Sequence, residues 1–408
     1  MIGVAAQACD LPSSRRAVDF AIAMGGGDAS LIGSSERASV ADAAFANAVM
    51  AHGLVQEDMH TPSVSHIGVV VWPSLLALSE HASARGEDLI AAGVAGYQVM
   101  GRLGRALMTK ELVRAFRPTG LIGAIGGAAA GARLLRLGED ETAAALALAA
   151  NTAGGLNEWP QVGGDEMFFH AGHAARNAVT SVVLAKAGAR GAETCLDALF
   201  SSYGNRARTS VPLDGGWDIL EVYHKPAPAC NYAQTPAQAA LAALKQSSFH
   251  PGDIERVLVK SFPEATAYPG CDHAGPYRNL LQAKMSIQFV VAATLAAGRL
   301  DDAALRDFSE DGAAARLARR VRLENDPEFA AAYPARQGSE VIVTLKSGNS
   351  VRARLPALEP LDVQGVRERF RRAVTRLLGE ARAAELEHAI DALPAGPDAG
   401  RIARLLAP

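Results

Sequence analysis

A ten-residue polar segment, Glu57–His66, separates two alanine-rich stretches and limits how this part of the chain can fold. It holds two carboxylates and two imidazoles. Its proline, Pro62, removes a backbone donor and moves the preceding residue out of the helical region. A helix therefore cannot continue through it, and we expect a loop between two buried helices, Ala41–Leu54 and Trp72–Ser83. Loops held by a rigid scaffold commonly carry functional side chains.

The composition favours a helical protein with more than one domain. Of 408 residues, 49% are apolar, but only 12 are Phe, 7 Tyr and 3 Trp, and alanine and leucine are abundant among the rest. Such residues favour closely packed helices over sheets, and a chain of this length usually forms two or three domains. The net charge is −3, and the sequence has no basic stripe that would suit nucleic acid or a membrane surface. Without an apolar tract of about 20 residues or a signal-peptide pattern, we expect a cytoplasmic protein.

Helical spacing of apolar residues predicts a large helical domain over residues 1–224. The expected helices cover approximately residues 14–23, 41–53, 73–84, 87–108, 122–135, 143–152 and 170–187. A loop rich in Gly, Asn and Pro is expected over residues 151–169.

Beyond residue 225 alternating apolar residues appear, which is typical of strands. We expect helices over 235–245 and 280–297, a strand over 254–260, and a hairpin of strands 341–345 and 351–355 around a Gly-Asn turn. The predicted fold is mainly α: a helical domain (1–224), a smaller α+β lid domain (225–358), and C-terminal helices (359–408) that return to the helical domain and make it discontinuous.

Three further segments combine polar side chains with the signals that begin or end helices. They are Phe116–Gly120, His170–Asn177 and His224–Tyr232. The first two lead into predicted helices, and prolines hold the third in an extended form. Like the first polar segment, they are places where functional groups can be exposed.

Several charged or titratable residues can be interpreted as either structural or functional. Lys225 is either a solvated surface lysine or a functional group. Arg102, near the C-terminal end of its helix, either complements the helix dipole or contacts substrate. His170 and His173 are three residues apart and could share a helix face. A zinc site would need further ligands that no spacing indicates, so we predict no metal.

Six side chains on these segments form the candidate site: Asp58, His60, His66, Arg117, His170 and Lys225. Histidine transfers protons near neutral pH, whereas arginine and lysine neutralise carboxylates. Removing a proton next to a carboxylate requires both a base and cations that hold the developing enolate charge. The set therefore indicates a small polycarboxylate as substrate. No nucleophile elbow, P-loop or dinucleotide-binding fingerprint suggests other chemistry.

The four cysteines, Cys9, Cys195, Cys230 and Cys271, are widely scattered. No pair has the spacing of a metal or redox motif. We expect free thiols rather than a disulfide framework.

As a set, the polar segments resemble those of the MmgE/PrpD family, which includes 2-methylcitrate dehydratase, cis-aconitate decarboxylase and iminodisuccinate epimerase. His170–Asn177 is similar to the end of the family pattern Thr-Lys-Arg-Leu-His-Ala-Gly-Arg-Ala-Ala-Arg-Asn. Lys225–Tyr232 is similar to Lys-Pro-Tyr-Pro-Cys-Cys-Arg-Tyr, and Ala283–Ile287 also matches. The resemblance extends from about Ala41 to the predicted hairpin.

The resemblance implies a cofactor-free homodimer with a helical domain, a smaller lid domain and a site between them. It further implies that Asp58, His66 and Lys225 occupy site positions of the family, with His60 beside them. Tyr232, at the end of the Lys225 segment, is added as a substrate-binding candidate together with Arg117 and Arg102.

The chain also departs from the family pattern. Met59 replaces a threonine, Arg117 replaces the histidine of Phe-His-Pro-Thr, Met167 replaces a lysine, and Phe289 replaces a tyrosine. These changes argue against methylcitrate or aconitate as the substrate. They also leave open a catalytically altered member of the family.

The leading hypothesis is a lyase of the hydro-lyase type that acts on a small polycarboxylate. His66 would be the base, and His60 or His170 the acid. Arg117 and Lys225 would bind carboxylates, and Asp58 would orient an imidazole. One alternative is an epimerase or isomerase of an amino- or imino-dicarboxylate, which needs bases on both faces of one carbon. Another is a binding protein without catalysis. The sequence leaves the substrate, and the choice among dehydration, decarboxylation and epimerisation, open.

Overall fold

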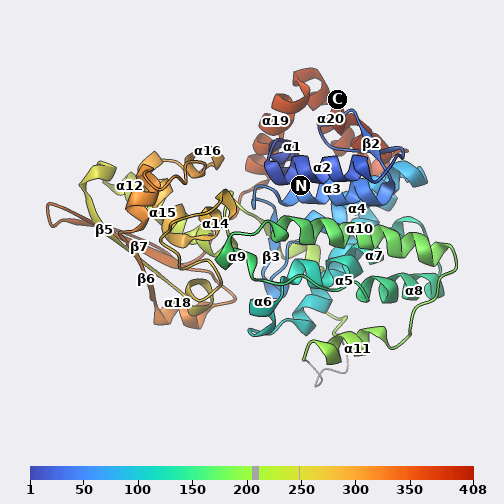
Figure 1. Cartoon of the computed structure of the whole chain (residues 1–408), viewed down its shortest axis with the longest axis horizontal. Coiled ribbons are helices and arrows are strands. Elements are labelled where there is room, and N and C mark those ends of the chain that lie inside the picture. The colour runs from blue at the N-terminus through green and yellow to red at the C-terminus, as the bar shows by residue number, and fades with distance from the viewer. Residues whose placement is uncertain (205–210, 248) are drawn as a thin grey trace. The chain divides into compact units, whose positions relative to one another are not determined.

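Helices make up most of the chain, which confirms the predicted mainly α class (Figure 1). The computed structural model describes residues 1–204, 211–247 and 249–408. Contacts divide them into a large unit (Met1–Asn157, Glu166–His224 and Asp362–Pro408) and a small unit (Glu158–Asp165 and Lys225–Leu361).

One short segment, Glu158–Asp165, groups with the small unit, although the predicted boundaries place it within residues 1–224. It contains α9 (Trp159–Val162), which packs against α14 (Leu280–Met285). The side chain of Gln282 donates to the carbonyl of Gln161 at 3.1 Å. A small polar connection of this kind leaves no periodic signal in the sequence.

Small side chains allow the helices of the large unit to pack closely, and α7 packs against both α5 and α10. The helices that precede the C-terminal segment are α1 (Ile2–Ala8), α2 (Pro12–Ala23), α3 (Val40–His52), α4 (Gly68–Ala82), α5 (Gly86–Leu107), α6 (Leu112–Ala115), α7 (Pro118–Leu134), α8 (Glu139–Ala150), α10 (Glu166–Lys186) and α11 (Cys195–Ser202).

Four of these helices begin at least four residues earlier than predicted, among them α8, which begins at Glu139 rather than near residue 143. α4 begins at Gly68 and contains Pro73 within it, α7 begins at Pro118, and α10 begins at Glu166 inside the expected loop over 151–169. Proline is well tolerated in the first turn of a helix, which explains the start of α7. The amide of Gly68 bonds to the Asp58 carboxylate at 3.2 Å, and this side chain caps the early start of α4.

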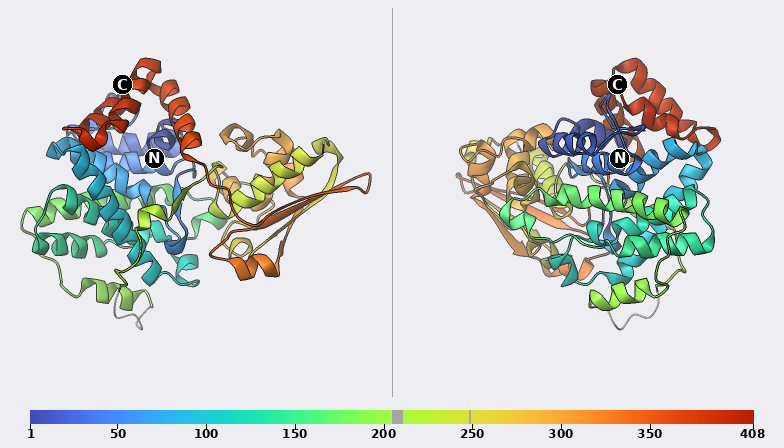
Figure 2. Two further views of the ribbon diagram at one scale, coloured as in Figure 1. Left: turned by 180° about the vertical axis from the view of Figure 1, so that it is seen from behind. Right: turned by 45° about the vertical axis from the view of Figure 1, so that its right-hand side comes forward.

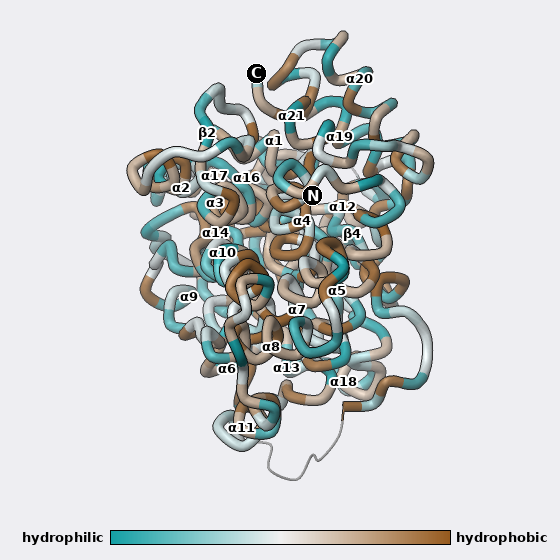
Figure 3. Tube along the Cα trace, turned by 90° about the vertical axis from the view of Figure 1, so that its right-hand side faces the viewer, coloured by the Kyte–Doolittle hydropathy of each residue, from teal (hydrophilic) through white to brown (hydrophobic). Residues whose placement is uncertain are grey.

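The C-terminal helices of the large unit pack against its first helices (Figure 2). They are α19 (Val363–Leu378), α20 (Glu380–Asp391) and α21 (Gly400–Leu406). α19 contacts α1, and α21 contacts α4. Hydrophilic residues recur along α19 and α20 (Figure 3).

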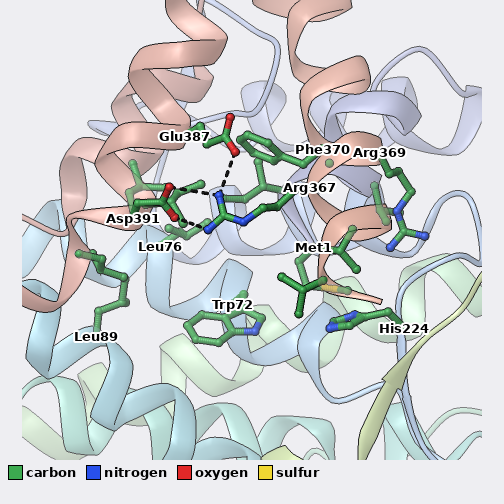
Figure 4. A pocket seen from close by; sticks show the side chains of 18 residues that line it. Met1, Trp72, Leu76, Leu89, His224, Arg367, Arg369, Phe370, Glu387 and Asp391 are labelled. Atoms are coloured by element: carbon green, nitrogen blue, oxygen red, sulfur yellow. Dashed lines mark hydrogen bonds and ion pairs between the residues drawn. The ribbon is translucent and has the colours of Figure 1, made fainter. Parts of the chain in front are cut away.

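A hollow of about 460 Å³ lies among these elements, with Trp72 and His224 in its wall (Figure 4). Arg367 crosses one side of it and pairs with Glu387 at 2.9 Å and Asp391 at 2.6 Å. Burial lowers the pKa of His224 to about 4. The wall of the hollow therefore carries a network of ion pairs beside an uncharged imidazole.

Two pairs of short antiparallel strands lie among the helices of the large unit. β1 (Ala29–Ser30) pairs with β2 (Arg37–Ala38), and β3 (Asp58–His60) pairs with β4 (Val222–His224). The segment expected to be a plain loop, Glu57–His66, thus contains a strand followed by a 3-10 turn, η1 (Thr61–Ser63). Three residues are too few for an alternating pattern, so the sequence did not reveal this strand.

The small unit is α+β, and the predicted hairpin is confirmed. β7 (Ser339–Leu345) pairs with β8 (Ser350–Leu355), and the sheet order is β6-β5-β7-β8, with β5 (Ile254–Ser261) and β6 (Val321–Asn325) parallel. α12 (Gln234–Gln246) packs on β7 and β8 and against α15 (Ile287–Ala297). The predicted helix over 280–297 is interrupted at Ser286, whose hydroxyl accepts from the amide of Phe289 and caps α15. The other elements are η3 (Asn231–Ala233), η4 (Pro251–Asp253), α13 (Pro263–Thr266), α16 (Asp302–Leu305), α17 (Ala313–Ala318) and α18 (Pro327–Ala332).

None of the helices in the described part of the chain is both long enough and apolar enough to span a bilayer.

We predict that Asn47 on α3 is essential to the packing of the N-terminal part. Its buried amide accepts from the backbone of Ile32 at 3.0 Å and donates to the carbonyl of Ser30 at 3.0 Å. Replacing it with leucine would leave both backbone groups buried without a partner, and we expect Asn47→Leu to lower the free energy of unfolding by about 3 kcal/mol. Urea denaturation followed by circular dichroism measures this loss. The exposed Asn349→Ala is the control, with a change within about 0.5 kcal/mol, and equal effects of the two substitutions would contradict the prediction.

Candidate active site

The polar segment Glu57–His66 is held by backbone bonds on both sides. Asp58 lies opposite His224 in the β3–β4 pair. The amides of His60 and Ser65 each donate to the other's carbonyl, at 3.0 and 3.3 Å. This closed turn fixes the two histidines of the segment, and their side chains make contacts in two different clusters.

The first cluster centres on Glu57, which is fully buried. Its Oε1 lies 2.9 Å from Nδ1 of His66 and 3.3 Å from Nδ1 of His52, at the end of α3. On the other side of His52, its Nε2 lies 2.9 Å from Nη2 of Arg117. We call these four residues, His52, Glu57, His66 and Arg117, the Glu57 cluster.

The contacts of the Glu57 cluster determine where the protons lie. A guanidinium has no acceptor, so Arg117 donates and Nε2 of His52 accepts. The proton of neutral His52 is therefore on Nδ1, where it faces Glu57. Nδ1 of His66 faces two acceptors, Glu57 and the carbonyl of Asp58 at 3.1 Å, so it too carries a proton. This leaves Nε2 as the basic nitrogen of the neutral His66 ring.

The carboxylate of Asp58 does not face an imidazole. Its Oδ2 accepts from the hydroxyl of Tyr97 at 2.5 Å, and that hydroxyl accepts from the indole of Trp72 at 3.0 Å. Burial raises the pKa of the Asp58 carboxyl above its ordinary value, and the hydrogen bond from Tyr97 acts against that shift. In this geometry Glu57 orients His66, whereas Asp58 contributes its backbone carbonyl and fastens the segment to α4 and α5.

His170 lies beside the Glu57 cluster. It is on α10, partly buried, and its ring packs close to Gly155. Burial and, to a smaller extent, the positive charge of Arg117 lower the pKa of His170 to about 4. His170 is thus uncharged at neutral pH. Its neighbour His173 packs instead against the ring of Phe45, with centroids 5.1 Å apart.

The second cluster forms around Asp218, which is buried on the short turn η2 (Asp218–Leu220). Its carboxylate lies 2.9 Å from Nε of Arg102, 2.9 Å from Nε of Arg105 and 3.2 Å from Nε2 of His60. Arg105 also pairs with Glu221 at 2.6 Å. We call this group the Asp218 cluster.

His60 links the Asp218 cluster to two hydroxyls. Its Nδ1 lies 2.7 Å from Oγ of Ser63, which lies 2.5 Å from Oγ of Ser65. The order carboxylate, imidazole, hydroxyl resembles a hydrolytic triad. However, His60, Ser63 and Ser65 are all fully buried, so a substrate cannot reach the hydroxyls. Burial lowers the pKa of His60 to about 4. The chain of contacts therefore fixes the shape of the turn rather than supplying a nucleophile.

Two glycines on one face of α5 admit this arrangement. A Cβ on Gly104 would lie 2.2 Å from Cβ of Ser63, and one on Gly101 would lie 2.6 Å from Cγ of Asp218. Only a bare backbone allows the turn and the Asp218 carboxylate to approach the helix so closely.

The structure thus brings some predicted site residues together and separates others. His66, Arg117 and Asp58 meet around Glu57, with His170 beside them. His60 and Arg102 belong to the Asp218 cluster, and Arg102 also donates to the carbonyl of Gly216 at 2.6 Å. Contact with Asp218 favours a structural role for Arg102 over the substrate contact that its sequence position left open.

Lys225 and Tyr232 belong to the small unit. Lys225 is buried, and in the chain it directly follows His224, the last residue of β4. Tyr232 lies in η3 and packs against Phe262 and Tyr268. Burial raises the pKa of Tyr232 well above its ordinary value, so its hydroxyl stays protonated.

Sequence reasoning did not select His52, Glu57, Tyr97 or Asp218 as site residues, although Glu57 lies in the first polar segment. His52 was counted as part of a buried helix, but its position just before the polar segment, at the opposite end from His66, was a usable signal. Asp218 lies in a stretch without periodicity, more than 150 residues from His60, and no local pattern could have indicated it.

Within residues 1–204, 211–247 and 249–408, no group of three or more His, Cys, Asp or Glu side chains is arranged to hold a metal ion.

Comparison with known proteins agrees with the resemblance of the motifs. The MmgE/PrpD N-terminal domain model matches residues 1–203, and the MmgE/PrpD C-terminal domain model matches residues 227–394. Cis-aconitate decarboxylase of Mus musculus is 27% identical over 394 residues, which cover 89% of this chain and 78% of the relative. The protein of the same name from Homo sapiens is 27% identical over 367 residues, covering 82% and 73%. A cis-aconitate decarboxylase-like protein, oryM of Aspergillus oryzae, is 31% identical over 186 residues, covering 44% and 38%.

We predict that the Asp218 carboxylate is needed for folding. In Asp218→Asn, Arg102 and Arg105 would lose the negative charge that compensates them in a buried setting, and we expect the free energy of unfolding to fall by about 3 kcal/mol. Urea denaturation measures the loss. Glu221→Gln is a matched control, because it removes the half-exposed partner of Arg105 and should cost less than about 1 kcal/mol. An equally large loss of unfolding free energy in Glu221→Gln would contradict the prediction that the burial of Asp218 causes the effect.

A second prediction concerns the stability of the folded protein at acidic pH. Because the pKa of His60 is lowered from 6.5 to about 4 in the folded state, the unfolded chain binds more protons between these values. The stability contributed by neutral His60 is complete above about pH 6.5 and is lost as the pH falls towards 4. We expect the wild-type urea midpoint to fall over this window and His60→Gln to reduce the slope by up to one proton. The exposed His81→Gln is the control, and an unchanged slope in His60→Gln would contradict the prediction.

Proposed function

Because this chain belongs to the MmgE/PrpD family, we propose that it is a cofactor-independent lyase that adds or removes water on a small polycarboxylate by moving a proton next to a carboxylate. The observation that carries this proposal is the Glu57 cluster, in which an imidazole is paired with a buried carboxylate close to a fixed cation. Relatives named cis-aconitate decarboxylase support a tricarboxylate-sized substrate.

In the proposal His66 is the general base. Its Nδ1 proton is held by Glu57 and by the Asp58 carbonyl, so Nε2 takes the proton from the substrate carbon. When the ring becomes positively charged, the carboxylate of Glu57 at 2.9 Å stabilises it. In many proton-transfer sites a carboxylate that is hydrogen-bonded to the other ring nitrogen stabilises the charged imidazole in this way.

Fixed cations would bind the substrate's carboxylates. Arg117 lies at the start of α7, and the hydroxyl of Thr119 accepts from the amide of His66 at 3.1 Å, so the base and the cation are held to one helix end. Lys225 is proposed as a second carboxylate-binding group, and Tyr232 as a residue that supports its segment, on the resemblance of that segment to the family pattern.

The acid that assists departure of hydroxide is proposed to be His170 rather than His60. His60 is fully buried between Asp218 and Ser63, which removes it from contact with a substrate. His170 is partly exposed on α10, next to Arg117. Contact with an anionic substrate would raise the pKa of His170 and favour its charged form.

A second candidate is epimerisation of an amino- or imino-dicarboxylate. One observation favours it: burial lowers the pKa of His170 to about 4, so this ring is a base at neutral pH in the unliganded protein. Two neutral imidazoles, His66 and His170, could then exchange protons on one carbon without a leaving-group acid. The two reactions differ in their products, since only the lyase changes the number of double bonds.

We predict that the wild-type protein converts at least one member of a panel of di- and tricarboxylates, followed by proton nuclear magnetic resonance in heavy water. New vinyl protons indicate the lyase, and deuterium incorporation without a new product indicates the epimerase. Absence of both, for a folded protein that binds a member of the panel, would leave only the binding-protein hypothesis.

We further predict that His66→Gln lowers kcat at least 100-fold while KM changes little, because the base acts only in the transition state. Arg117→Gln should mainly raise KM, because a carboxylate contact is lost in both ground and transition states. The matched control His81→Gln, an exposed histidine on α4, should leave both constants unchanged. A His66→Gln variant with more than about a third of the wild-type kcat would exclude His66 as the base.

A further inference from the structure

Two cysteines that are far apart in the sequence meet inside the small unit. Sγ of Cys230 and Sγ of Cys271 are 3.7 Å apart, and both residues are buried. The scattered spacing predicted no pairing, and both thiols are reduced in this structure. Cys9 and Cys195 are partly exposed and lie in the large unit.

The backbones of both cysteines are anchored to the same short junction between α14 and α15. The amide of Cys230 donates to the carbonyl of Lys284 at 2.9 Å, and the carbonyl of Cys271 accepts from the amide of Ile287 at 2.9 Å. Lys284 is itself fixed by a buried ion pair with Asp302 at 3.0 Å. Because both anchors lie within four residues of one another, the two thiols cannot drift apart while the unit is folded.

The surrounding side chains hold the same two segments together. Tyr232, two residues after Cys230, packs against Tyr268, three residues before Cys271, with ring centroids 5.3 Å apart. A disulfide requires an S–S distance of about 2.05 Å. Closing the gap therefore needs less than 2 Å of movement, which two side-chain rotations can share without separating the rings.

We propose that Cys230 and Cys271 form a reversible redox-modification site, in which a hydroperoxide oxidises the two thiols to a disulfide. In the first step the sulfur of Cys230 attacks one peroxide oxygen, the O–O bond breaks, and water leaves after the thiol proton is transferred. In the second step Cys271 displaces the hydroxyl of the resulting sulfenic acid as water, and the S–S bond forms. Two thiols and one peroxide thus give one disulfide and two waters, with two electrons passing from sulfur to the peroxide.

The environment assigns the order of these steps. Cys271 is fully enclosed, whereas Cys230 keeps a small exposed fraction of 5%, so a molecule as small as hydrogen peroxide reaches Cys230 first. Burial, together with Cys230, raises the pKa of Cys271 well above its ordinary value, so Cys271 is a protonated thiol that waits as the resolving partner. Protonation and enclosure make the reaction slow, and they protect the thiols from bulky reagents.

The disulfide would join the segment that carries Lys225 and Tyr232 to the turn that ends at Cys271. In the reduced protein hydrogen bonds and ring packing help to hold this segment. Oxidation would close a covalent loop between residues 230 and 271 inside the small unit, and a thiol reductant would open it again. The site is independent of the proposed reaction, because it needs neither substrate nor the Glu57 cluster.

The test is peptide mapping by mass spectrometry of the folded full-length chain, with and without hydrogen peroxide. After denaturation and alkylation, we expect the number of alkylated cysteines to fall from four to two on oxidation. A cross-linked peptide pair containing Cys230 and Cys271 should appear, and dithiothreitol should restore all four alkylations. The double variant Cys9→Ser/Cys195→Ser keeps the pair and should fall from two alkylated cysteines to none.

The variant Cys271→Ser separates the two steps. It should form no intramolecular disulfide, and the sulfenic acid on Cys230 should be trapped by dimedone. If that variant does not fold, the double variant alone still decides the question. The proposal would be overturned if Cys230 and Cys271 both remained open to alkylation after peroxide treatment of the folded double variant. It would also be overturned if the cross-link formed only when the protein was unfolded in urea before the peroxide was added.

Discussion

A buried carboxylate shared by two imidazoles is the interaction on which the large unit's polar centre depends. Glu57 is fully buried, and a charge in so dry a position is costly unless it is well bonded. His52 lies between Glu57 and the guanidinium of Arg117 and contacts both. This requires α3, the polar segment and the start of α7 to meet at one point.

The same turn must also satisfy the Asp218 cluster. The amides and carbonyls of His60 and Ser65 bond to each other, so one closed backbone turn separates His60 of the Asp218 cluster from His66 of the Glu57 cluster. The two differ in kind, however. The Asp218 cluster gathers two arginines around one buried carboxylate and fixes the shape of the turn, whereas the Glu57 cluster contains His66, the base of the proposed reaction.

Much of the fold could be predicted from the sequence, because the features that determine it are local. Small-residue helices, their caps and the β7–β8 hairpin leave periodic signals within 10 to 20 residues. The errors fall where the determining contact is distant. Pro73 was taken as a helix start, but the carboxylate of Asp58 caps α4 at Gly68. The pairing of β3 with β4 joins three-residue strands that are more than 150 residues apart, and no alternation can appear in so few residues.

For the site, the same distinction explains what was found and what was missed. His66 and Arg117 were visible because each stands in a short polar segment beside a proline. Asp58 was expected to orient an imidazole, whereas the carboxylate that contacts the ring of His66 is that of the adjacent residue, Glu57. That exchange has a chemical consequence. In the proposed reaction the base His66 and the cation Arg117 are joined by a chain of contacts through Glu57 and His52. Because arginine keeps its charge at every physiological pH, Arg117 would bind a carboxylate but would not serve as the acid. The departure from the family pattern at Arg117 is therefore compatible with the proposed proton transfer at His66, and in the proposal the acid is His170.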